Sequence, residues 1–84
     1  MKIKPVGSNM TELEGADGTT ILFSYQTPVA AFVPGKGFMK TDKFFSSSTT
    51  KHINKWIQMN GDPESTVTTI SQSLIEEAVA TIEN

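Results

Sequence analysis

The chain has 84 residues, of which 37% are apolar and 19% are charged, and it carries a net charge of −2 and no cysteine. A chain of this length buries only roughly 60% of the surface that it exposes when unfolded, so we expect a single domain over residues 1–84 and exclude a large multi-domain enzyme. The lack of cysteine excludes a disulfide framework, a thiolate nucleophile and a cysteine-based metal site.

Residues 1–45 are predicted to be rich in β-strand. Polar and apolar residues alternate over 2–6 and again over 10–14, and turn-forming residues occupy 7–9 between them. An alternation with a period of two residues is typical of a strand that has one buried face. These residues therefore predict a first hairpin.

Three further strands are expected after a second, glycine-containing turn. The β-branched and aromatic residues of 19–26 predict the first of them. Pro28 cannot donate to a strand ladder, so the next strand, over 29–33, is expected to start after it or to lie at a sheet edge. Pro34-Gly35-Lys36-Gly37 has proline and glycine at the central positions of a type II turn, which predicts that 38–41 returns antiparallel.

The hydrophobic period changes in the second half of the chain. A run of serine and threonine offers N-cap residues, and apolar residues at helical spacing predict a helix over about 49–59 that ends in a left-handed cap at Asn60-Gly61. A linker is expected over 60–65, and a second amphipathic helix over about 71–83. The β-branched residues before this helix leave the conformation of 65–70 open.

Together these elements predict an α+β fold. It consists of an antiparallel β-meander of four to five short strands followed by two helices packed on one face. The apolar side chains that would hold the helices on the sheet are Ile53, Trp56, Ile57, Leu74, Ile75, Val79 and Ile82.

Titratable side chains are too few and too scattered to predict catalysis. His52 is the only histidine and has no second ligand at metal-binding spacing, so its simplest place is on a helix face beside Trp56. Gly35-Lys36-Gly37 lacks the upstream glycine and the hydroxyl residue of a phosphate-binding loop, and a hairpin turn explains it. Glu76 and Glu77 point about 100° apart on a helix. We expect no catalytic residue, cofactor or metal.

The remaining signal is a local excess of lysine. All seven lysines precede residue 58, whereas residues 58–84 hold five acids and no lysine. A solvated face neutralised by the acidic C-terminal segment would explain this pattern, and a surface for an anionic partner is the functional alternative. Five lysines within twenty residues would form that surface: Lys36, Lys40, Lys43, Lys51 and Lys55.

Aromatic residues alternate with these lysines over residues 36–56. Proteins that bind single-stranded nucleic acid combine a basic groove with aromatic stacking platforms, and the helix N-terminus at 46–50 would suit a phosphate. Against nucleic acid, the chain has no arginine, and Trp56 with at least one of Phe44 and Phe45 is needed in the core. Nucleic-acid binding is therefore the alternative hypothesis.

Three strings of residues carry a resemblance. They are Gly7-Ser8-Asn9, Ser-Tyr-Gln-Thr-Pro-Val-Ala-Ala at 24–31 and Thr-Thr-Lys-His-Ile-Asn-Lys-Trp at 49–56. Through them, residues 1–57 resemble a family of small uncharacterised proteins, a domain of unknown function, encoded by bacteriophages and mobile elements. The resemblance implies an intracellular life in an infected bacterium and brings no activity or site residue to this chain.

The sequence as a whole favours a small, non-enzymatic accessory protein that binds a macromolecule, first of all a host or phage protein. Nucleic acid is the alternative partner, and a second copy of the chain is a third, because strands such as 10–14 or 29–33 would pair at a sheet edge. No stretch approaches the roughly 18 apolar residues of a membrane span, and the chain reaches Pro5 and Gly7 without an apolar signal segment. We expect a cytoplasmic protein without membrane contact.

Overall fold

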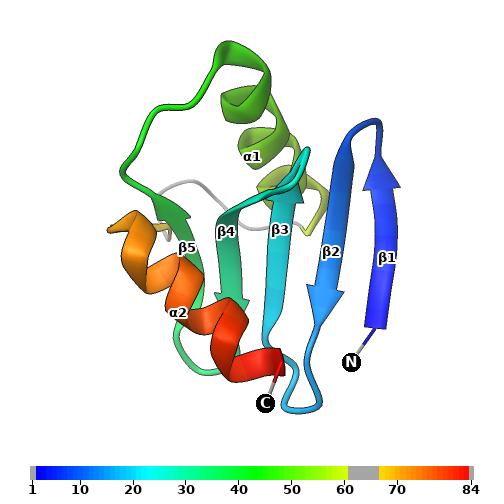
Figure 1. Ribbon diagram of the computed structural model, residues 1–84, viewed down its shortest axis with the longest axis vertical. Coiled ribbons are helices and arrows are strands. Elements are labelled where there is room, and N and C mark those ends of the chain that lie inside the picture. Colours follow the sequence, from blue (N-terminus) through cyan, green and yellow to red (C-terminus); the bar gives the residue numbers. More distant parts are fainter. Residues whose placement is uncertain (1, 61–66, 84) are drawn as a thin grey trace.

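The computed structural model describes residues 2–60 and 67–83. Within them the sheet order follows the chain order; β1 to β5 are antiparallel, and the last strand lies parallel to β5 (Figure 1). This confirms the predicted α+β class and its meander, and most of the predicted linker at 60–65 lies outside the described residues. The elements are β1 (Lys2–Gly7), β2 (Met10–Glu14), β3 (Thr20–Ser24), β4 (Thr27–Val33), β5 (Gly37–Thr41), α1 (Ser47–Met59), β6 (Thr68–Ile70) and α2 (Gln72–Glu83).

The turn between β4 and β5 has the predicted type II geometry. The Lys36 backbone N–H donates to the Val33 carbonyl at 2.9 Å, and Gly35 has a φ of 85°. Only glycine adopts such a φ without steric cost, while proline at the preceding position fixes its own φ. The local sequence alone therefore determines where this hairpin turns.

Strand β4 begins earlier than predicted and lies inside the sheet. The expectation that Pro28 would precede the strand or mark an edge is wrong, because β4 includes Pro28 and pairs with strands on both sides. The pairing shifts register here: Leu22 faces Ala30 whereas Phe23 faces Pro28, so Val29 is an extra residue on β4. A bulge is a position at which an interior strand tolerates the missing proline N–H.

The two helices lie on opposite faces of the sheet, and the prediction that both pack on one face is wrong in this respect. Ile53 and Trp56 of α1 pack with Leu22, whereas Val79 of α2 packs with Ile21. Successive side chains of a strand point to opposite faces. In Figure 1, α2 accordingly crosses in front of β4 and β5, and α1 lies behind the sheet.

Helix α1 starts two residues before its predicted position. The Ser46 side chain accepts a hydrogen bond from the Thr49 backbone N–H at 3.1 Å, which satisfies one of the free donors of the first turn. At the other end, Asn60 has a φ of −92°, so it does not adopt the left-handed conformation, and its side-chain amide donates to the Trp56 carbonyl at 2.8 Å. Gly61, the other half of the predicted cap, lies outside the described residues.

Residues 68–70, left open by the sequence, form a strand. Met39 pairs with Thr68 and Thr41 with Ile70, and the chain returns beside β5 after passing through α1. Thr68 and Thr69 are β-branched, a residue type that is restricted in helices and suited to strands. Helix α2 therefore begins only at Gln72, close to the predicted start.

Helix α2 docks through a narrower set of residues than predicted. Ile75 is fully buried, and the Gln72 amide donates to the Pro28 carbonyl at 2.8 Å. Leu74, which was predicted to face the sheet, is 50% exposed, because the neighbouring Ile75 takes the inward direction. The helix is thus held by Ile75 and the Gln72 hydrogen bond near its start, and by Ala78, Val79 and Ile82, which pack against the core farther along it.

The strands considered for self-association are not sheet edges. Strand β2 lies between β1 and β3, and β4 lies between β3 and β5. The edge strands are β1, which carries Lys2, Lys4 and Pro5, and β6, which has three residues. Lysine and proline on an edge strand disfavour the addition of another strand.

Candidate functional site

Four of the five predicted site lysines lie on β5, in the loop that follows it and on α1, and two of them, Lys40 and Lys43, line the same hollow. Lys40, on β5, and Lys43, in the following loop, line a hollow of about 190 Å³ between the strand end and α1. Lys51 and Lys55 are exposed on the helix, one turn apart. We define the β5–α1 surface by its four lysines and one exposed aromatic residue: Lys40, Lys43, Phe44, Lys51 and Lys55.

Lys36 lies apart from these residues. It precedes β5 whereas Lys43 follows it, and a rise of about 3.3 Å per strand residue separates the two backbones by roughly 20 Å. Lys36 instead lines a second hollow beside α2. The structure therefore does not bring the five lysines onto one surface, because the hairpin turn holds Lys36 at the other end of the strand.

The aromatic residues of this region divide into core and surface. Phe38 and Trp56 are core residues whose rings meet edge to face, with centroids 5.4 Å apart. Phe45 packs against the same core, and the Lys43 ammonium lies 5.2 Å from its ring centroid, within cation–π range. Phe44 is 72% exposed. The Phe44 side chain is therefore largely exposed to solvent. It is adjacent in sequence to Lys43, whose ammonium group lies over the Phe45 ring.

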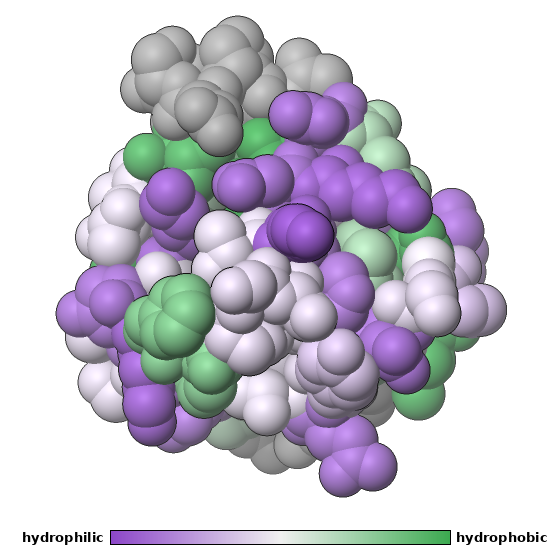
Figure 2. Space-filling model, turned by 90° about the horizontal axis from the view of Figure 1, so that it is seen from above, coloured by the Kyte–Doolittle hydropathy of each residue, from purple (hydrophilic) through white to green (hydrophobic). Residues whose placement is uncertain are grey.

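The end of the molecule nearest α1 is mainly hydrophilic. Figure 2, which looks onto this end from above, shows hydrophilic and near-neutral residues over most of the face, with one hydrophobic group among them and others toward the rim. This distribution differs from that of a domain with one continuous apolar docking patch. Contacts made by this face would be mainly polar, with apolar contacts at separate positions.

The hydroxyl groups at the start of α1 are used within the molecule. Ser46 caps the helix, and the Thr50 hydroxyl donates to the Ser46 carbonyl at 3.2 Å. The Thr49 hydroxyl is 3.0 Å from the Ser24 hydroxyl, at the end of β3. These side chains thus cap α1 and join it to the sheet, and their internal hydrogen bonds reduce what they offer to the phosphate considered from the sequence.

His52 extends the same hydrogen-bonded group. Its Nδ1 lies 2.7 Å from the Ser24 hydroxyl, and its ring centroid lies 5.6 Å from that of Tyr25. Ser24 is only 2% exposed, so its hydroxyl faces the protein interior. Tyr25 has a φ of 58°, an uncommon value for a bulky residue in a two-residue turn. The arrangement fastens the β3–β4 turn to α1.

Replacing Ser24 with alanine is expected to lower the free energy of unfolding by about 1–3 kcal/mol, because the buried Thr49 hydroxyl and the His52 ring nitrogen each lose a partner. Urea denaturation followed by circular dichroism measures this loss. Ser48→Ala, at an exposed position in the first turn of α1, is the matched control and is expected to change stability by less than about 0.5 kcal/mol. Equal midpoints for the two variants would contradict the structural role of Ser24.

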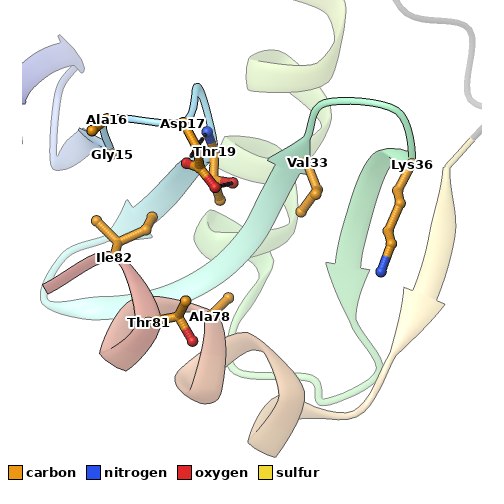
Figure 3. A pocket seen from close by; sticks show the side chains of 9 residues that line it. All are labelled: Gly15, Ala16, Asp17, Thr19, Val33, Lys36, Ala78, Thr81 and Ile82. Atoms are coloured by element: carbon orange, nitrogen blue, oxygen red, sulfur yellow. Dashed lines mark hydrogen bonds between the residues drawn. The ribbon is translucent and has the colours of Figure 1, made fainter. Parts of the chain in front are cut away.

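A larger hollow, of about 500 Å³, lies at the opposite end of the sheet from the β5–α1 surface. Its walls are the β2–β3 turn, the end of β4 with the turn that follows, and the last turns of α2 (Figure 3). We call it the α2 pocket. Its charged groups are Asp17 and Lys36, which Figure 3 shows on different walls, and its apolar lining includes Val33, Ala78 and Ile82.

Asp17 is held in a fixed position in the β2–β3 turn. The Thr19 backbone N–H donates to one carboxylate oxygen at 3.0 Å, and the Thr19 hydroxyl donates to the other at 3.1 Å. These bonds, first of all that from the backbone, lower the pKa of the Asp17 carboxyl below its usual value, so it is ionised at neutral pH. The sequence analysis did not single out Asp17, although an aspartate two residues before a threonine in a turn is a known local signal for such bonds.

The described residues hold neither a metal-ligand cluster nor a membrane-spanning helix. Among residues 2–60 and 67–83, no three histidine, aspartate or glutamate side chains cluster as metal ligands would. In the same part of the chain, no helix is long and apolar enough to cross a membrane.

The structure defines the class of the protein as a small α+β domain with a mostly antiparallel sheet between two helices. The chain belongs to a family of unknown function (DUF8033), which it matches over residues 1–76. Neither a curated protein nor a solved structure matches it. The predicted membership of a family of unknown function is thereby confirmed. The match includes the whole β5–α1 surface and ends within α2, before Ala78 and the other helix residues of the α2 pocket.

Proposed function

We propose that the protein is a non-enzymatic binding domain that recognises an acidic segment of another protein through the β5–α1 surface. The observation that carries this proposal is the exposure of Phe44, at 72%, next to a hollow lined by Lys40 and Lys43. Aromatic residues are frequent anchors of protein interfaces, and lysines around such an anchor select partners of opposite charge.

The hollow itself suits an acidic side chain. Thr50 and Asn54 of α1 bring a hydroxyl and an amide to its wall, and Ile53 gives it an apolar base. A partner's aspartate or glutamate would place its carboxylate between the lysines and its methylene groups on Ile53. Asp42 also lines the hollow, so its negative charge limits how many acidic groups the hollow accepts.

Protein is favoured over nucleic acid by what the structure does with the aromatic residues. Phe38 and Trp56 are buried, which leaves Phe44 as the exposed stacking platform of the β5–α1 surface. Lys36 is at the other end of β5, and the chain has no arginine. A groove that tracks a phosphate backbone needs several platforms and a continuous row of cations.

We further propose that the protein is a phage-type accessory protein that acts in the cytoplasm of an infected cell, on a host or phage partner. The resemblance carried by the strings at 7–9, 24–31 and 49–56 supports this origin. A second copy of the chain is a weaker candidate partner, since one edge strand, β1, carries lysines and a proline and the other, β6, has three residues.

The test compares charge-matched variants of the immobilised domain. Lys43→Gln should weaken binding of a retained partner by about threefold and Phe44→Ala by about tenfold, whereas the control Lys4→Gln should bind like the unchanged protein. The readout is the Kd of the purified partner, measured by calorimetry. All of these residues are exposed, so folding should be unaffected.

Two outcomes would overturn the proposal. A partner that all variants bind equally would place the interface elsewhere on the molecule. If the retained species is RNA or DNA, with an affinity that falls steeply between about 50 and 200 mM salt, the alternative of nucleic-acid binding replaces this one.

A further inference from the structure

The α2 pocket has the size and lining of a small-ligand site. Its volume of about 500 Å³ falls within the roughly 300–1,000 Å³ of ligand pockets, and such pockets combine an apolar lining with a few fixed polar groups. The pocket shares no residue with the β5–α1 surface. Its role is therefore separate from the proposed function.

We infer that the α2 pocket binds a zwitterion of amino-acid or short-peptide size, with its ammonium group at Asp17, its carboxylate at Lys36 and its aliphatic part on Val33, Ala78 and Ile82. Figure 3 shows the two charged side chains on different walls of the hollow and the apolar side chains among them. This order of groups across the pocket is the basis of the inference.

The Asp17 end is built to receive a cation. Thr19 holds both carboxylate oxygens, so the negative charge has a fixed position before a ligand arrives. A carboxylate oxygen has a second lone pair, and each oxygen of Asp17 therefore keeps one for a ligand donor. A preformed position lowers the entropy that binding has to overcome.

The Lys36 end rests on the type II turn. The Lys36 N–H bonds to Val33 across this turn, and Gly35 adopts the φ that the turn requires. The backbone of Lys36 is thereby fixed, and Figure 3 shows its side chain extending from the turn along the side of the pocket toward α2. Its ammonium group supplies the positive charge of the pocket.

Gly15 allows α2 to close the third wall. A Cβ at this position would lie 3.1 Å from Cγ1 of Ile82 and 3.3 Å from a carboxylate oxygen of Asp17. The lack of a side chain thus lets the end of the helix approach the turn. The apolar wall and the fixed carboxylate come to lie side by side.

Ligands of other charge types fit this arrangement less well. A dianion would bring one negative group to Asp17, and a dication would bring one positive group to Lys36, so each contains one repulsive contact. An uncharged apolar ligand would cover both charged groups without pairing them. A zwitterion pairs with both charged side chains, and its aliphatic part contacts the apolar lining between them.

The experiment is a titration of the ¹⁵N-labelled protein with linear ω-amino acids of increasing length, followed by amide chemical shifts. We expect saturable shifts at Thr19, Lys36 and Ala78, with a best length in the series. Hexanoate and hexylamine, which each keep one charge, should bind up to about fivefold more weakly than the best zwitterion, as expected for the loss of one exposed ion pair.

A pair of variants with matched charge changes completes the test. Asp17→Asn, which keeps an oxygen for the Thr19 N–H, combined with Lys36→Gln should raise the Kd by about tenfold or more. The control Lys2→Gln with Glu14→Gln removes one charge of each sign from exposed positions on β1 and β2 and should leave the Kd unchanged. The dispersion of the amide spectrum shows whether each variant is folded.

Three results would overturn the inference: shifts that do not saturate for any chain length, singly charged analogues that bind as tightly as the zwitterions, or a folded Asp17→Asn, Lys36→Gln protein that binds like the control. None of them affects the proposed function, because the partner test uses variants of other residues. Loss of partner binding would in turn leave the titration of the α2 pocket unchanged.

Discussion

Replacing Trp56 with alanine is expected to lower the free energy of unfolding by about 3–5 kcal/mol, the largest effect of a single substitution that we expect in this chain. Trp56 is 1% exposed, meets Phe38 edge to face, and donates from Nε1 to the Glu12 carboxylate at 2.7 Å. The variant loses this packing and leaves the half-buried carboxylate without its donor. Small domains are stable by only about 5–15 kcal/mol, so the urea midpoint should fall markedly.

Two comparisons separate the contributions of Trp56. Met59→Ala, on the same helix but 53% exposed, is expected to change stability by less than about 0.5 kcal/mol. Trp56→Phe keeps an aromatic ring but removes the N–H that bonds to Glu12 together with part of the buried ring, and is expected to cost less than Trp56→Ala. If Met59→Ala were as damaging as Trp56→Ala, the inward face of α1 would be assigned wrongly.

Replacing Ile75 with alanine is expected to cost about 2–5 kcal/mol, the second large effect. Ile75 is fully buried and lies in the helix that covers the face of the sheet opposite α1. Its loss creates a cavity between α2 and the sheet, and the same urea experiment measures the cost.

The neighbouring residue gives a matched control for Ile75. Leu74→Ala removes a side chain of the same volume class at the next position, but Leu74 is 50% exposed, so we expect a loss of less than about 1 kcal/mol. A larger cost for Leu74 than for Ile75 would mean that α2 presents the other side to the sheet. The pair therefore tests the placement of α2 directly.

The strand and turn pattern could be predicted because each hairpin depends on neighbouring residues. The type II turn at Pro34-Gly35 is an example, because proline fixes its own φ and glycine can adopt the positive φ that the next position requires. The cap of α1 at Ser46 is also formed within one turn, although the run of serine and threonine from 46 to 50 offered several N-cap residues and the predicted start lay two residues too late. Elements of this kind need no information from distant parts of the chain.

The positions of the helices on the sheet could not be predicted in this way. Amphipathic spacing shows that a helix has one buried face but does not show which face of the sheet it covers. A signal was present in the strands: Ile21 and Leu22, and again Ala30 and Ala31, are buried neighbours that point to opposite faces. Unbroken apolar pairs of this kind indicate a sheet covered on both sides.

The candidate sites depend still more on tertiary arrangement. Lys36 and Lys43 are close in sequence, yet the length of β5 places them at opposite ends of a strand. Asp17 and Lys36 belong to different hairpins, and the pocket that they share exists only once α2 crosses the sheet. The distribution of charge along the sequence groups Lys36 with Lys43, which lie far apart, and does not group Asp17 with Lys36, which line the same pocket.

The agreement between sheet order and chain order has a consequence for how the molecule folds. Each antiparallel pair from β1 to β5 is closed by a connection of two to five residues, so the entropy lost in forming it is small. Contacts between residues near in sequence favour rapid folding. Strand β6 is the exception, because α1 lies between it and its partner β5 in the sequence, and α2 follows it. The meander is thus the natural early structure of the chain, and β6 and α2 are its late additions.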